Sequence, residues 1–140
     1  MSTAEENKEQ FRRMYEEGLN GGNLAVTDEL IDPECINHEA PPGVENRGPE
    51  SMRLVITMLR TAFPDLHFTI EELISEGDIV AGRLTMSGTQ EGPLMGMPPT
   101  GRPVRQSHMH FVRMREGKAI EHWGVRDDVG MMRQLGTFPE

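Results

Sequence analysis

The hydrophobic positions in the first 63 residues recur at helical spacing and predict helices. Thr3–Glu6 has the spacing of a capping box, so a helix is expected to begin there. Phe11, Met14, Tyr15 and Leu19 follow three or four residues apart and mark its buried stripe. The run from Asn20 to Asn23 ends this helix, because it is built of asparagine and glycine.

Two further helices are predicted before Pro64. A short one runs from Asn23 to Leu30, and Pro33 is expected to end it. Cys35–His38 follows as a brief extended segment. The next helix begins at Pro49, a residue that suits the first helical position. It carries the most regular apolar stripe of the chain, which consists of Met52, Val55, Ile56, Leu59 and Phe63.

After Pro64 the period of the pattern changes to two, which predicts strands. Leu66, Phe68 and Ile70 alternate with polar residues, as in a half-buried strand. The predicted strands are 66–74, 79–90, 104–114 and 118–125, with a Gly- and Pro-rich loop at 91–102 and a terminal helix capped by Asp127. Helices that precede strands indicate one α+β domain over residues 1–140, in which the helices pack on a strongly curved antiparallel sheet.

The last two strands bring three histidines together. A three-residue turn at Arg115–Gly117, a type I turn followed by a glycine with a bulge, places His110 opposite His122 and His108 opposite Gly124. Side chains alternate along a strand, so these four residues would share one face, whereas a two-residue turn would swap that parity. Three imidazoles around a glycine-sized gap form the best candidate for a pocket wall.

Composition and charge exclude several classes of function. A formal net charge of −9 argues against nucleic acid and against an anionic membrane surface. The N-terminus lacks a signal-peptide pattern, and no apolar run approaches the ~20 residues of a membrane span. The single cysteine, Cys35, rules out an internal disulfide and fits a reducing compartment. We therefore expect a cytoplasmic protein that binds neither nucleic acid nor membrane.

The histidine cluster has three interpretations. Three histidines match the ligand count of a zinc site, but no carboxylate is placed to orient them, and we expect no metal. Imidazoles also titrate near neutrality and can take a proton next to a carbonyl, with Asp127 or Glu121 nearby. In the third interpretation the histidines hydrogen-bond in a polar patch and only position a ligand. Trp123 has the opposite parity, which favours a core or subunit-interface position.

Short motifs between residues 37 and 136 together resemble a known family. They are Asn37-His38, Gly48-Pro49-Glu50, Ala62–Leu66 (AFPDL), Met95–Arg102 (MGMPPTGR), Glu116–Lys118 (EGK), Glu121–Trp123 (EHW) and Arg133–Gly136 (RQLG). This combination is similar to the SnoaL-like polyketide cyclases, also called ester cyclases. The resemblance implies a cone-shaped α+β barrel of the nuclear-transport-factor-2-like (NTF2-like) type, with a deep apolar pocket and a homo-oligomeric assembly. It also implies an intramolecular aldol condensation that needs no metal or organic cofactor.

The same resemblance assigns individual pocket residues. Asn37 and His110 match a pocket asparagine and a pocket histidine of the cyclases, and His108 stands where they have a glutamine. Gly124 stands where they keep the catalytic aspartate, and a glycine cannot transfer a proton. Asp127 matches an acid of the family that is not the catalytic one.

These observations predict a cofactor-independent acid–base enzyme that acts on a polyketide-like or other apolar carbonyl compound, by cyclase, isomerase or hydratase chemistry. His110, His108 and Asp127 are the predicted catalytic residues. The predicted substrate-binding residues are Asn37, His38, His122, Trp123 and Met97. The alternative is a non-catalytic protein that binds a small apolar ligand. The expected partners are that small molecule and further copies of the chain, in a dimer or tetramer.

Overall fold

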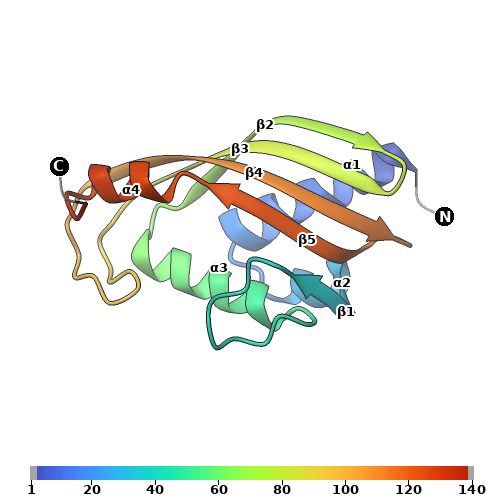
Figure 1. Cartoon of the computed structure of the whole chain (residues 1–140), viewed down its shortest axis with the longest axis horizontal. Coiled ribbons are helices and arrows are strands. Elements are labelled where there is room, and N and C mark those ends of the chain that lie inside the picture. The colour runs from blue at the N-terminus through green and yellow to red at the C-terminus, as the bar shows by residue number, and fades with distance from the viewer. Residues whose placement is uncertain (1–2, 139–140) are drawn as a thin grey trace.

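The computed structural model describes residues 3–138, which form helices and one five-stranded sheet (Figure 1). The elements are α1 (Ala4–Arg13), the π-helix η1 (Met14–Asn20), α2 (Ala25–Leu30), β1 (Ile31–Asn37), α3 (Glu50–Ala62), β2 (His67–Glu76), β3 (Ile79–Thr89), β4 (Pro103–Arg115), β5 (Lys118–Arg126) and α4 (Asp128–Gln134). Within residues 3–138, no helix is long and apolar enough to cross a membrane.

The predicted helices form close to the expected residues. The capping box is present, since Thr3 Oγ1 accepts from the backbone N–H of Glu6 at 3.1 Å and Glu6 Oε2 accepts from that of Thr3 at 3.3 Å. The first helix extends to Asn20, but its last seven residues, from Met14 onward, are π-helical. Pro49 immediately precedes α3 and makes no capping hydrogen bond, whereas Asp127 caps α4 by accepting from the backbone N–H of Gly130.

The sheet is mixed, so the prediction of an antiparallel sheet is wrong for its first strand. The strand order is β1-β5-β4-β3-β2, and β1 runs parallel to β5 with Asn37 beside His122. Strand β1 starts directly where α2 ends and joins the free edge of β5. Pro33 therefore lies within an edge strand, where a proline is tolerated because no neighbouring strand needs its missing N–H.

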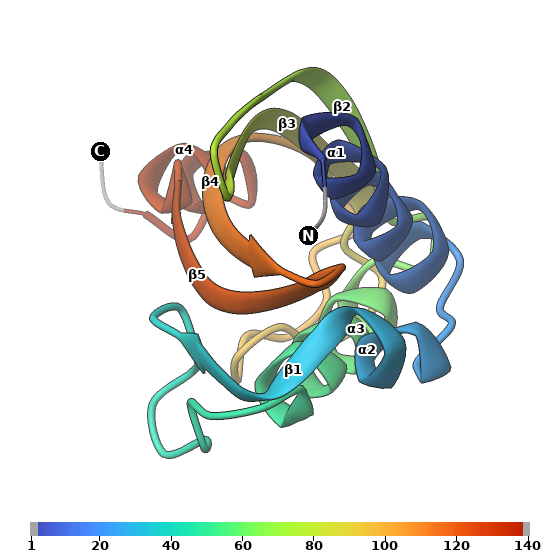
Figure 2. The same ribbon diagram turned by 90° about the vertical axis from the view of Figure 1, so that its right-hand side faces the viewer.

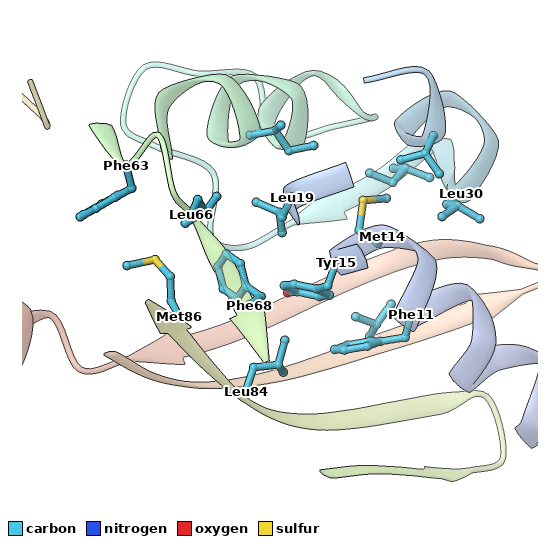
Figure 3. Packing of buried hydrophobic residues seen from close by; sticks show 14 of the residues in the cluster. Phe11, Met14, Tyr15, Leu19, Leu30, Phe63, Leu66, Phe68, Leu84 and Met86 are labelled. Carbon is cyan, nitrogen blue, oxygen red and sulfur yellow. The ribbon is translucent and has the colours of Figure 1, made fainter. Parts of the chain in front are cut away.

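The sheet curves strongly, and helices cover its concave face. Strands β2 to β5 form an arc, and α1 and α3 both lie towards its open side, with α1 beside β2 (Figure 2). Gly82 permits the close approach of α1, because a Cβ there would lie 2.8 Å from Cζ of Phe11. In the core, Tyr15 lies between Phe11 and Phe68, with ring centroids 5.0 and 5.3 Å away (Figure 3). The sheet does not close into a full barrel, since β1 and β2 are its two edges.

The hairpin of β4 and β5 differs from its predicted register by two residues. Its turn has two residues, Glu116 and Gly117, since Arg115 pairs with Lys118. A register shift at Ile120 follows, and beyond it His110 pairs with Gly124. With the two-residue turn alone, His110 and His122 would lie on opposite faces of the sheet. The extra residue in β5 shifts the pairing by one more position and returns both side chains to the same face. The predicted pairing is therefore wrong, while the shared face is present.

Candidate functional site

A cavity of about 420 Å³ lies between the concave face of the sheet, η1 and α3. This volume falls within the usual range for small-molecule pockets, about 300–1,000 Å³. Helix α3 contributes an apolar wall of Met52, Val55, Met58 and Leu59. The polar part of the lining consists of Tyr15, Asn37, His38, Glu39, Gln106, His108, His110, His122, Arg126 and Asp128.

Three histidines form a continuous hydrogen-bonded row on the sheet side of this cavity. His108 Nδ1 lies 3.1 Å from His110 Nε2, and His110 Nδ1 lies 2.9 Å from His122 Nε2. The rings of His110 and His122 also stack, with centroids 5.0 Å apart. Alternation along β4 and β5 produces this arrangement, because all three side chains point to the concave face. We call these three residues the histidine row.

Each end of the histidine row contacts a side-chain amide. Gln106 Oε1 lies 2.7 Å from His108 Nε2, and Asn37 Oδ1 lies 2.7 Å from His122 Nδ1. The Gln106 Nε2 group donates to the backbone carbonyl of Asp127 and to Asp128 Oδ1, both at 3.2 Å.

Asn37 is held in a similar way. Its Nδ2 group donates to Ser51 Oγ at 2.9 Å, and its Oδ1 also accepts from the backbone N–H of Glu39 at 2.9 Å. The row is thus connected to α4 at one end and to α3 at the other.

Burial dominates the electrostatics of the row. His108, His110 and His122 are all buried, and removing an imidazolium from water is unfavourable. Burial, followed by the nearby Arg126 guanidinium, lowers the pKa of His108 and of His122 to about 4. The pKa of His110 is lowered well below its ordinary value, first by burial and then by the other two rings. Burial also raises the pKa of the Tyr15 hydroxyl, which keeps its proton beside the cavity.

The gap expected at Gly124 is filled by its neighbours. A Cβ at this position would lie 2.6 Å from His110 Nδ1 and 3.5 Å from Cγ of Glu39. The glycine therefore leaves room for the His110 ring, and it does not leave open space for a ligand.

Of two other predicted residues, His38 lies at the rim of the cavity and Trp123 lies outside it. His38 lines the cavity but is partly exposed, and its Nε2 lies 2.7 Å from Glu121 Oε2. Trp123 stacks on His38, with ring centroids 5.1 Å apart, and does not line the cavity. Trp123 therefore supports His38 from the outer face of the sheet, as its parity in β5 requires.

Asp127 and Met97 do not line the cavity. Asp127 is exposed, and its Oδ1 accepts from the backbone N–H of Gly130 at 2.8 Å, so its carboxylate serves as a helix cap. Met97 packs against the core, and its neighbours Leu94 and Met95 line the cavity instead. The loop is held by Gln90, whose amide bonds to the carbonyls of Gly92 and Pro98.

Several cavity residues were missed in the sequence. Tyr15 belongs to the predicted apolar stripe of the first helix. Its hydroxyl, alone among apolar side chains, was the one sign that it faces a cavity. Gln106 lies two residues before His108, so the alternation of β4 already put it on the same face. Arg126 and Asp128 lie at the end of β5 and the start of α4, and no sequence pattern marked them.

The histidine row is not arranged as a metal site. Each of its six ring nitrogens faces another side chain along the row, so the nitrogens do not converge on one point. Across residues 3–138, no group of three His, Cys, Asp or Glu side chains could hold a metal ion.

Comparison with known proteins gives a consistent family. The model of the SnoaL-like polyketide cyclases matches residues 9–135. The aklanonic acid methyl ester cyclase DnrD of Streptomyces peucetius is 35% identical over 127 residues, covering 89% of this chain and 87% of its own. The nogalonic acid methyl ester cyclase of Streptomyces nogalater is 31% identical over 119 residues, covering 84% and 89%.

Solved structures show the same fold. TsrD from Streptomyces laurentii superposes with a TM-score of 0.89 at 30% identity, over 99% of this chain and 100% of its own. IdmH from Streptomyces antibioticus has a TM-score of 0.80 at 35% identity, over 93% and 98%. The predicted NTF2-like α+β architecture is therefore confirmed.

Proposed function

The chain belongs to the SnoaL-like polyketide cyclase family, and on that premise we propose that it is an acid–base enzyme for an apolar, polyketide-like carbonyl compound. The observation that carries the proposal is the row of three buried imidazoles along the wall of a cavity large enough for such a molecule. The curated relatives act on methyl esters of aklanonic and nogalonic acid, and compounds of that class are the proposed substrates.

The proposed chemistry uses proton transfer by side chains and needs no cofactor. His110, at the centre of the row, takes a proton from the carbon next to a substrate carbonyl, and the C–H electron pair remains on the substrate as an enolate. The enolate carbon then attacks a second carbonyl carbon of the same molecule, which closes a ring. The proton returns to the resulting alkoxide, so that the enzyme ends as it began.

Neighbouring groups would stabilise the developing charge. The protonated hydroxyl of Tyr15 and the guanidinium of Arg126 both line the cavity. The buried Tyr15 hydroxyl is a donor shielded from water, and such a donor stabilises an enolate oxygen more strongly than water does. Arg126 is exposed and adds positive charge at the rim of the cavity. His110, as the proton acceptor, would take the place of the catalytic aspartate that the resemblance of the sequences assigns to position 124 in the cyclases.

A second candidate function, non-catalytic binding, is favoured by one observation. All six ring nitrogens of the row already face a protein partner, so none is held free for a substrate. In this alternative the cavity accommodates a small apolar ligand and the row only shapes its wall.

Turnover of aklanonic acid methyl ester and of nogalonic acid methyl ester distinguishes the two. Ring closure is expected, and His110→Phe should lower its rate about 10²–10⁴-fold, because it removes the central imidazole and keeps a ring of similar shape. The matched control is His67→Phe, which changes an exposed histidine on β2. Binding without ring closure, proton exchange or isomerisation would support the non-catalytic alternative.

A pair of substitutions on α3 tests whether the cavity is the binding site. Val55 lines it, whereas the adjacent Leu54 is exposed. Val55→Trp should fill the cavity and weaken binding at least about tenfold, and Leu54→Trp should not. Equal effects of the two variants would move the proposed site elsewhere.

The proposal includes a cytoplasmic homodimer or tetramer. Its support is an apolar outer face of the sheet, where Met109, Phe111 and Val125 are exposed. These residues alternate with the inward-facing histidines, so a second copy could cover them without obstructing the cavity.

A further inference from the structure

We propose that the histidine row is a proton-accepting unit that takes up one proton, and that Gln106 and Asn37 are the positioning residues that fix this number. The proposal deepens the acid–base function and rests on it, since it names the group that accepts the substrate proton. It follows from counting the hydrogen-bonded contacts of the row and the protons available to fill them.

The row has four contacts and, when all its rings are neutral, three protons. The contacts join Gln106 Oε1, the three rings in order, and Asn37 Oδ1. Each contact needs one N–H, and both terminal oxygens can only accept. A neutral imidazole carries one N–H, so three neutral rings leave one contact without a proton. A fourth proton completes all four hydrogen bonds.

The orientation of each terminal amide is fixed by partners whose roles are not in question. Gln106 Nε2 faces a backbone carbonyl and a carboxylate, those of Asp127 and Asp128, and both can only accept. Asn37 Oδ1 faces the backbone N–H of Glu39, which can only donate. Rotating either amide by 180° would create a contact between like groups, so both oxygens point at the row.

The fourth proton belongs on His110. The acceptor oxygens require a proton on His108 Nε2 and on His122 Nδ1, which leaves His108 Nδ1 and His122 Nε2 as lone pairs. His110 lies between these two lone pairs. A neutral His110 can donate to one of them, whereas a doubly protonated His110 donates to both. The central ring therefore gains a hydrogen bond by accepting a proton, which makes it a base.

The groups that face the row limit it to one added proton. Tyr15 faces it from η1, Arg126 from β5 and Asp128 from α4, while His38 and Glu39 lie beyond the end of β1. Helix α3 contributes apolar side chains and Ser51. A second added proton would put two like charges on adjacent buried rings beside a guanidinium, at a large desolvation cost.

Histidine nitrogen NMR counts these protons without any substrate. In wild-type protein labelled with ¹⁵N-histidine, the rings of the row should respond together as the pH falls below about 6.5, with a total uptake of one proton while the protein stays folded. His110 should become doubly protonated, while His108 stays protonated at Nε2 and His122 at Nδ1. Separate titration of the three rings, uptake of more than one proton, or no uptake before the protein unfolds would overturn the proposal.

Three variants test whether the shared pKa of the row moves in the expected direction. Asn37→Asp keeps the acceptor and adds negative charge, and it should raise the shared pKa by about one unit, a tenfold change in affinity. Gln106→Leu removes one acceptor, so three protons satisfy the row, and the shared pKa should fall by about as much. Asn23→Asp, which adds the same charge at an exposed position just before α2, should leave it unchanged.

The failures of this proposal and of the enzymatic function are distinguishable. Shifts in the same direction for Asn37→Asp and Gln106→Leu would overturn the one-proton unit even if turnover is normal. If Gln106→Leu does not fold, the proton uptake of the wild-type protein and the pKa change in Asn37→Asp still test the one-proton unit. Conversely, a correct proton count without turnover would overturn the enzymatic function and leave the one-proton unit in place.

Discussion

At the scale of single residues, Gly124 and the histidine row depend on each other. The His110 ring occupies the space in which any side chain at position 124 would begin. A carboxylate there and the present position of His110 are therefore mutually exclusive. This explains why a chain with this row carries glycine at the position that the cyclases' sequence pattern assigns to their acid.

Gly124→Ala tests this dependence. The added Cβ would lie 2.6 Å from His110 Nδ1, and a buried ring has little room to retreat. We expect a loss of about 1–3 kcal/mol in the free energy of unfolding, together with loss of the contact between His110 and His122. Urea denaturation and histidine NMR measure the two effects. Val125→Ala, at the neighbouring exposed position, is the control, and equal losses in both variants would contradict the argument.

The sequence predicted that these residues share a face, but it did not predict the hydrogen bonds between their side chains. Alternation along the strands was enough to group His108, His110 and His122. The contacts between their rings depend on side-chain rotamers and on Asn37, whose strand is adjacent in space but distant in sequence, and no periodicity encodes either. Asp127 shows that nearness in sequence is not enough to place a side chain in the pocket. Its carboxylate accepts a hydrogen bond from the backbone of α4.

At the scale of elements, the β4–β5 hairpin differs from its prediction in two ways, a shorter turn and a bulge, and together they keep the histidines on one face. The turn has both central residues at positive φ, with Glu116 at 51° and Gly117 at 80°, as in a type I′ turn. The sequence Glu-Gly does not carry the usual asparagine signal for this turn, and a three-residue turn was predicted instead. The bulge at Ile120 left no composition signal either.

Glu116→Asn should stabilise this hairpin. Asparagine tolerates positive φ better than glutamate, and Asn-Gly is a preferred type I′ pair. We expect a gain of about 0.5–1 kcal/mol in the free energy of unfolding. Gly117→Ala should have the opposite effect, because its φ of 80° is unfavourable for a residue with a Cβ. Chemical denaturation checks both variants, and a destabilising Glu116→Asn would refute the assigned turn.

The helices were easier to predict than the sheet order. Capping residues and apolar stripes are local signals, and they located α1, α3 and α4 within a few residues. The parallel pairing of β1 with β5 joins residues about 85 positions apart, such as Asn37 and His122. Nothing local distinguishes a parallel from an antiparallel edge strand.

At the scale of the whole molecule, the buried row makes stability depend on pH. The pKa of His108 and of His122 is about 4 in the folded chain, compared with about 6.5 in an unfolded one. Below about pH 6.5 the unfolded chain therefore binds more protons than the folded chain. Stability is fully present above that pH and is lost as the pH falls toward 4.

We expect the free energy of unfolding to fall between pH 7 and 5.5. The slope below pH 6.5 should approach about 1.4 kcal/mol per pH unit for each ring kept neutral. Urea denaturation at several pH values measures it, and this range avoids most carboxylate titration. His108→Gln removes one such ring and should give a shallower slope. An unchanged slope in that variant would show that the row does not couple folding to protons.

The position of Asn37 has a consequence for the dynamics of the protein. Asn37 belongs to β1, an edge strand that pairs with β5 and is bonded on its other side by the loop residues 46–48, whereas the rings sit on two central strands. Edge strands fray more readily than the strands that they cover. Each transient release of β1 from β5 thus withdraws the terminal acceptor and leaves the imidazoles in place, so the basicity of the site is tied to breathing at one border of the sheet.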